Sequence, residues 1–157
     1  MNPKIGLTDV SIKGVVSILN TLLSDEYLLY TKTLNYHWNV EGLHFNELHK
    51  FFEFQYGDLA GVIDSVAERV RALGGEALGS LNAFLKHTRL KEPVKSRKNA
   101  KEMLKDLLVD HEAIIRYLRK DLETCDTPYQ DIGTNDFLTG LMAKHEKMAW
   151  MLRASLG

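Results

Sequence analysis

The sequence has few cysteines and prolines, and neither sign of charge is in excess. Cys125 is the single cysteine among 157 residues, so no disulfide can form within one chain. The 20 Lys and Arg against 21 Asp and Glu give a net charge of -1, which excludes a nucleic-acid binder that works through its overall charge. No apolar run follows Lys4, and no window approaches the roughly 20 apolar residues of a membrane span. We therefore expect a cytoplasmic protein that does not enter a membrane.

Apolar side chains recur at intervals of three and four residues, which is typical of helices. They predict a first long helix between a cap at Thr8 or Asp9 and a stop at Gly42, and others at about 46–73 and 96–123. A fourth follows a cap at Thr134 or Asn135, and a short helical turn is expected at 81–85. The predicted fold class is all-α, a four-helix bundle with a short extra helix between helices two and three. Residues 1–157 are expected to form one domain, with 1–7 as a short flexible segment.

Histidine and carboxylate side chains are concentrated in residues 37–68, among aromatic side chains. On a helical wheel of about 100° per residue, Glu53, Asp64 and Glu68 lie within roughly 100° of His49, so the four face one side of the second helix. Imidazole and carboxylate ligands together suit iron or another divalent transition metal. The segment is therefore a candidate metal site.

The rise of that helix separates these ligands too far for one site within one chain. At about 1.5 Å per residue, His49 and Asp64 are about 22 Å apart along the axis, and Glu53 and Asp64 about 17 Å. Two antiparallel copies that cross near residue 58 would bring Asp64 and Glu68 of one chain beside His49 and Glu53 of the other. We infer two equivalent intersubunit sites per dimer.

Small residues at the crossing point would allow the two helices to approach closely, namely Gly57, Ala60 and Gly61. His37, across the Gly42 turn, could join the same site. The alternative is that each of these polar side chains is an ordinary solvated or capping residue. The Glu-x-x-His pair of di-iron bundles occurs at Glu41 and His44 by letters alone, because Gly42 indicates a turn there, which argues against a di-iron site inside one bundle.

The segment 36–69 resembles the Dps family (DNA-binding protein from starved cells), the mini-ferritins. The matching features are His-Trp-Asn at 37–39, a second histidine at 49, an acid at 53, and Asp64 followed by Ala-Glu-Arg at 67–69. The resemblance covers nearly the whole chain. It implies a ferritin-like four-helix subunit that assembles as a hollow dodecamer, with ferroxidase centres at two-fold dimer interfaces.

The resemblance also implies a role for each matching residue. His37 and His49 would bind iron from one subunit, with Glu53 helping; Asp64 and Glu68 would come from the other subunit, and Glu68 would bridge two irons when both are bound. Position 53 is most often aspartate in the family, so the longer glutamate leaves the coordination there open.

The implied reaction is oxidation of Fe(II) to Fe(III), with hydrogen peroxide preferred over dioxygen, followed by storage of a ferric oxide mineral that protects DNA. Trp38 would be a radical sink beside His37, or equally an interface packing residue. Asp126, Asp131 and Asp136 would line a pore that attracts Fe(II), with helix capping and a solvated loop as the alternative.

Strong DNA binding is not expected. Family members that bind DNA tightly often carry a lysine-rich tail, whereas this chain has Lys4 and Lys13 near its start and a mixed-charge segment at 86–105. The alternative function is a structural, nucleoid-associated cage that compacts DNA and has little ferroxidase role. Three further histidines fit no ligand pattern and are interpreted as surface or packing residues: His87, His111 and His145.

Overall fold

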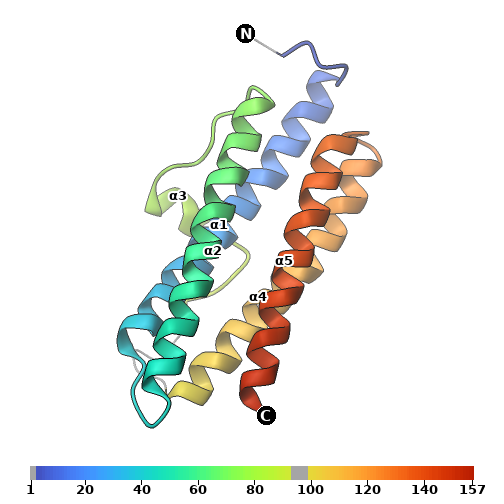
Figure 1. Cartoon of the computed structure of the whole chain (residues 1–157). Helices are drawn as coiled ribbons and strands as arrows, with labels where there is room; N and C mark the ends of the chain where they lie inside the picture. The colour runs from blue at the N-terminus through green and yellow to red at the C-terminus, as the bar shows by residue number, and fades with distance from the viewer. Residues whose placement is uncertain (1–2, 93–98) are drawn as a thin grey trace.

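A computed structural model describes residues 3–92 and 99–157, and within these ranges it contains five helices and no strand. The helices are α1 (Asp9–Asn39), α2 (Phe45–Ala72), α3 (Leu81–His87), α4 (Ala100–Asp126) and α5 (Ile132–Leu156). Figure 1 shows α1 and α2 as one antiparallel pair and α4 and α5 as a second, and the short helix α3 lies within the connection between the pairs. The all-α bundle with a short extra helix is thus confirmed. None of these described helices is long and apolar enough to cross a membrane.

Side-chain caps fix where the long helices begin. Thr8 accepts a hydrogen bond from the Ser11 amide at the start of α1, as predicted. At the start of α5, the Asp131 carboxylate accepts from the Thr134 amide at 2.9 Å. The predicted cap at Thr134 or Asn135 is therefore wrong, because both residues lie inside α5.

Helix α4 begins with a reciprocal cap, in which Asn99 and Glu102 each bind the backbone amide of the other. It continues to Asp126, beyond the predicted end near 123. The predicted start at 96–98 lies outside the described residues.

The hydrophobic core lies between the two helix pairs. Its fully buried members come from all four long helices and include Leu19, Leu22, Leu59, Val62, Leu107, Ile114, Leu118, Leu138 and Leu152. At about 25 cal/mol per Å² of buried apolar area, this core is the main stabilising contribution to the fold.

A close approach between Gly14 and Tyr129 holds the turn before α5 against α1. A Cβ atom added at Gly14 would lie 2.1 Å from Cζ of the Tyr129 ring, far inside van der Waals contact. We expect Gly14→Ala to displace this ring and to destabilise the protein by about 1–3 kcal/mol, the usual cost of overpacking. Unfolding by denaturant measures the change, and Gly14→Ala/Tyr129→Ala should be more stable than the single variant. Equal stability of Gly14→Ala and the unchanged chain would contradict this packing.

A chain of polar side chains crosses the core from α1 to α5 and α4. Oε1 of Glu26 lies 2.8 Å from Nε2 of His145, and Nδ1 of His145 lies 2.9 Å from Nδ1 of His111. All three residues are fully buried. Oε2 of Glu26 and Nε2 of His111 have no hydrogen-bond partner among the described residues. His111 and His145 were predicted to be surface or packing residues, and their burial agrees with packing. Their connection to Glu26 was not predicted.

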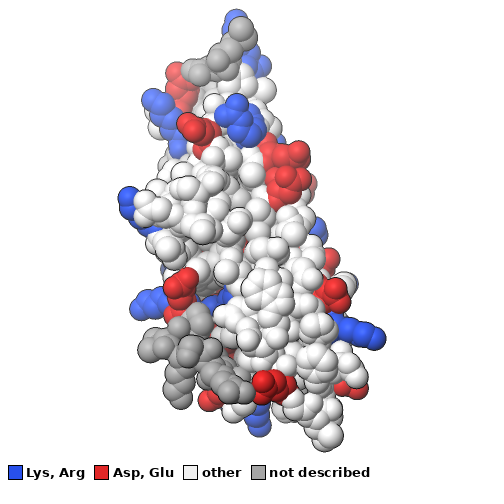
Figure 2. Space-filling view, turned by 90° about the vertical axis from the view of Figure 1, so that its left-hand side faces the viewer, with Lys and Arg blue, Asp and Glu red and all other residues white. Residues whose placement is uncertain are grey.

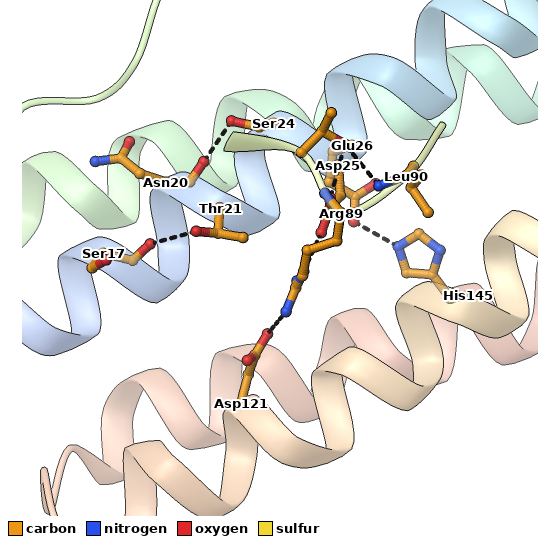
Figure 3. A network of polar contacts seen from close by, with 11 residues as sticks. Ser17, Asn20, Thr21, Ser24, Asp25, Glu26, Arg89, Leu90, Asp121 and His145 are labelled. Atoms are coloured by element: carbon orange, nitrogen blue, oxygen red, sulfur yellow. Dashed lines mark hydrogen bonds and ion pairs between the residues drawn. The ribbon is translucent and has the colours of Figure 1, made fainter. Parts of the chain in front are cut away.

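A second, partly buried network holds the connection after α3 against the bundle. The Arg89 guanidinium pairs with Asp25 of α1 at 2.7 Å and with Asp121 of α4 at 2.9 Å (Figure 3). It also lies 4.3 Å from the centre of the Tyr117 ring. Burial raises the pKa of Asp25 and Asp121, and the Arg89 charge opposes this shift. Arg89 therefore links the connection to α1 of one helix pair and to α4 of the other.

Burial of His111 makes the stability of the fold depend on pH. Desolvation, and then the charge of neighbouring His145, hold the pKa of His111 well below its ordinary value. The unfolded chain takes up a proton near pH 6.5 that the folded chain does not, so stability is present above that pH and is lost as pH falls below it.

We expect a loss of about 1.4 kcal/mol per pH unit from this group below about pH 6.5. The measurement is denaturant unfolding between neutral and mildly acidic pH, with His111→Asn as the reference. Its amide can either donate to or accept from Nδ1 of His145, and it does not titrate. Identical pH profiles for the two proteins would contradict the prediction.

Candidate metal centre

The end of α1 and the start of α2 bring His37 and His49 face to face. The two imidazole rings stack with their centres 3.8 Å apart and their planes at 20°. Nδ1 of His37 lies 2.8 Å from the backbone oxygen of His49, and Nδ1 of His49 lies 2.8 Å from the backbone oxygen of His37. A backbone oxygen of α2 thus positions the His37 ring, and a backbone oxygen of α1 positions the His49 ring.

These reciprocal contacts determine which ring nitrogens carry protons. A carbonyl oxygen can only accept, so Nδ1 of His37 and of His49 must each donate. In the neutral rings the Nε2 atoms then carry lone pairs, and a hydrogen bond to the other nitrogen is the usual way in which a metal-ligating histidine is oriented. In that form both Nε2 atoms are available to accept a hydrogen bond or a metal ion.

Aromatic rings enclose the histidine pair. Phe45 stacks on His49 with ring centres 5.1 Å apart, and Tyr56 meets the His37 ring edge-on at 5.2 Å. His37 is 8% exposed and His49 is half-buried. These contacts limit the rotation of both rings.

The predicted carboxylate ligands lie on the exposed side of α2. Glu53 follows His49 by one turn, whereas Asp64 and Glu68 lie towards the other end of the helix, and all three are exposed in the single chain. No group of three or more His, Cys, Asp or Glu within the described residues could hold a metal ion. One chain therefore brings His37 and His49 together, and does not bring the whole predicted set to one point.

The middle of this α2 face carries no covering side chains. A Cβ atom at Gly57 or Gly61 would meet no atom of the described residues within 4 Å, and neighbouring Phe54 is 45% exposed. Glycine inside a helix costs roughly 1 kcal/mol relative to alanine. This arrangement offers a flat, partly apolar strip against which another helix can pack.

Trp38 lies next to His37 in the sequence and faces outward, with 68% of its side chain exposed. The turn between α1 and α2 contains Glu41 and His44, as the sequence predicts, so they do not form a helical Glu-x-x-His pair.

The predicted pore residues occupy different environments around the turn between α4 and α5. Asp126 and Asp136 are exposed, while Asp131 is 4% exposed and serves as the α5 cap. Arg69 of α2 reaches the same point, with Nη2 3.2 Å from the Asp131 carboxylate and Nε 3.0 Å from the Thr134 hydroxyl. In a single chain the Asp131 carboxylate thus accepts hydrogen bonds from protein donors as a helix cap, which was the alternative to the predicted pore role.

Comparisons with known proteins agree with this architecture. A family model for the ferritin-like domain matches residues 16–157. The chain is 48% identical to a low temperature-induced protein of Nostoc over 96% of this chain and 84% of that protein, and 35% identical to DNA protection during starvation protein 2 of Bacillus anthracis over 92% of this chain and 97% of that protein. The chain belongs to the Dps family of ferritin-like proteins.

A solved Dps structure extends this likeness to three dimensions. A Dps protein from Vibrio cholerae O1, described as a member of a broad superfamily of ferritin-like diiron-carboxylate proteins, matches with a TM-score of 0.92 and 31% identity. The match covers 99% of this chain and 97% of that one. The Dps fold predicted from residues 36–69 is confirmed, and with it membership of a family linked to iron storage and DNA protection.

Proposed function

We propose that the protein is a ferroxidase and iron store that oxidises Fe(II) with hydrogen peroxide at sites shared between two subunits. The observation that supports this most is the His37–His49 pair, whose reciprocal backbone hydrogen bonds leave both Nε2 atoms available as ligands. Fe(II) is borderline in ligand preference and accepts imidazole, while carboxylates suit the harder Fe(III) product.

The remaining ligands would come from a second copy of α2. An antiparallel crossing at Gly57 and Gly61 would place Asp64 and Glu68 of one subunit beside His37 and His49 of the other. Glu53 would join from the histidine side, and Glu68 would bridge two irons. Two Fe(II) together supply the two electrons that reduce one hydrogen peroxide to two waters, with uptake of two protons, so no hydroxyl radical is released.

The larger assembly is part of the same proposal. Twelve subunits would enclose a cavity in which ferric oxide accumulates, and the protein would act in the cytoplasm to protect DNA. Asp126 and Asp136 are exposed and would attract Fe(II) at a pore. Asp131 would hold that segment in place through its contacts with Arg69 and Thr134.

The stoichiometry of iron oxidation tests the proposal. The assembled protein is loaded with Fe(II) without oxygen and receives a limiting pulse of hydrogen peroxide while ferric absorbance is followed. We expect rapid oxidation of two irons per peroxide. Oxidation no faster than in protein-free buffer would contradict the proposal.

A DNA-compacting cage is the second candidate function. Lys and Arg side chains lie mostly along the margins of the face shown in Figure 2, and the described residues form no continuous basic stripe there. Twelve copies could still add weak contacts together. A gel shift at two salt concentrations separates the two functions, and tight binding that persists at the higher salt would favour the DNA-compacting role.

A further inference from the structure

Glu26 is a fully buried carboxylate that no Lys or Arg of the described residues neutralises. Each of the other buried acids in this part of the chain forms an ion pair with a Lys or Arg: Asp25 with Arg89, Asp110 with Lys32, and Asp131 with Arg69. Oε1 of Glu26 has Nε2 of His145 at 2.8 Å as its partner (Figure 3), and Oε2 has none among the described residues. Because a buried charge without a counter-charge is strongly unfavourable, Glu26 requires a positive charge or a proton.

The elements packed around Glu26 supply no free cation within the described residues. The buried residues of α2 include one polar side chain, the uncharged amide of Gln55. Arg89, from the connection after α3, is already shared by two carboxylates. The titratable side chains that remain are His145 of α5 and, 2.9 Å beyond it, His111 of α4. A proton held by these histidines is therefore the counter-charge within reach of the carboxylate.

The hydrogen bonds of the row Glu26–His145–His111 determine where such a proton goes. An ionised carboxylate only accepts, so Nε2 of His145 donates to it, and Nδ1 of neutral His145 then accepts from Nδ1 of His111. This arrangement carries one negative charge. One additional proton reverses the second bond, so that Nδ1 of His145 donates to Nδ1 of His111 and His111 carries its own proton on Nε2. The row is then uncharged overall and keeps both hydrogen bonds.

His111 is a neutral ring in both arrangements. This agrees with its burial, which holds its pKa well below the ordinary value. The two arrangements differ in the tautomer of His111, which is protonated on Nδ1 when the row is charged and on Nε2 when the row is uncharged. The tautomer therefore shows whether the additional proton is present.

We infer that Glu26, His145 and His111 share one additional proton at neutral pH and act as a pH-sensitive link between the two helix pairs. The proton lies between Glu26 and His145, and its loss at higher pH leaves an uncompensated charge between α1 and α5. The unfolded chain, whose histidines have a pKa of about 6.5, does not hold this proton at neutral pH. Stability from the shared proton is thus fully present below about pH 6.5 and is lost as the pH rises. The inference does not depend on the proposed ferroxidase function.

Solid-state NMR of the sedimented protein with ¹⁵N-labelled histidine tests the inference directly. The ¹⁵N shifts distinguish protonated from unprotonated ring nitrogens, and His111→Asn and His145→Asn assign the signals. At neutral pH we expect His111 to be protonated on Nε2 and unprotonated on Nδ1. His111 protonated on Nδ1 alone at neutral pH would overturn the inference.

Denaturant unfolding at fixed protein concentration, from neutral to mildly alkaline pH, gives an independent measurement. We expect the folded-to-unfolded ratio of the unchanged protein to fall by about tenfold more per pH unit than that of Glu26→Gln, which keeps the size of the side chain but holds no shared proton. Glu123→Gln is the matched control, since Glu123 is an exposed acid on α4, and it should follow the unchanged protein. Equal pH profiles for Glu26→Gln and the unchanged protein would overturn the inference.

Discussion

Replacing His145 by leucine is expected to lower the free energy of unfolding by about 3–5 kcal/mol, the usual cost of removing one partner of a buried pair. His145 bonds to Glu26 at 2.8 Å and to His111 at 2.9 Å in a fully buried setting. Leucine would leave the Glu26 carboxylate without its donor, and Oε2 of Glu26 already has no partner among the described residues. Unfolding by denaturant at fixed protein concentration measures the loss.

Removing the whole polar chain should cost less than breaking it. The triple variant Glu26→Leu/His111→Leu/His145→Leu removes every polar side-chain atom of this buried row of three residues. Apolar replacement of a buried polar network is often neutral or stabilising. We therefore expect the triple variant to be more stable than His145→Leu. A triple variant that is less stable than the single variant would show that the three polar side chains together make a net stabilising contribution.

The second large effect is expected on catalysis. Glu68→Ala should slow peroxide-driven iron oxidation at least about 100-fold, because loss of groups that only orient ligands already costs 10–100-fold. Glu123→Ala is the matched control, since Glu123 is also exposed on a long helix but lies on α4. Stopped-flow ferric absorbance compares the two variants. Equal rates would remove Glu68 from the site.

Much of the fold could be predicted because local signals agreed with one another. The apolar periodicity and the glycines at 42 and 74 located α1 and α2, and both glycines have positive φ angles in the structure. The α5 cap was misplaced because Asp131, Thr134 and Asn135 are all good capping residues. The contact of Asp131 with Arg69, 62 residues away, is a tertiary interaction that local pattern cannot reveal.

The candidate site was predictable in composition and less so in its internal geometry. The spacing of His49, Asp64 and Glu68 along one helix indicates a shared site, since it depends only on helix rise. The reciprocal contacts of His37 and His49 depend on how the turn closes, which the sequence does not specify. The position of Glu26 within the apolar stripe of α1, near Leu22 and Leu29, was the one signal that could have revealed the buried chain.

The central claim is that each metal site takes ligands from two subunits, and coexpression of two inactive variants tests it most directly. His49→Ala chains lack one half of the site and Glu68→Ala chains lack the other. In a two-fold dimer of one chain of each kind, one site carries both defects and the other is intact. With random pairing, roughly a quarter of all sites should be intact, and peroxide-driven iron oxidation should recover to about that fraction of the unchanged rate. Activity no higher than that of either variant alone, in assemblies shown by mass spectrometry to contain both chains, would contradict the shared site.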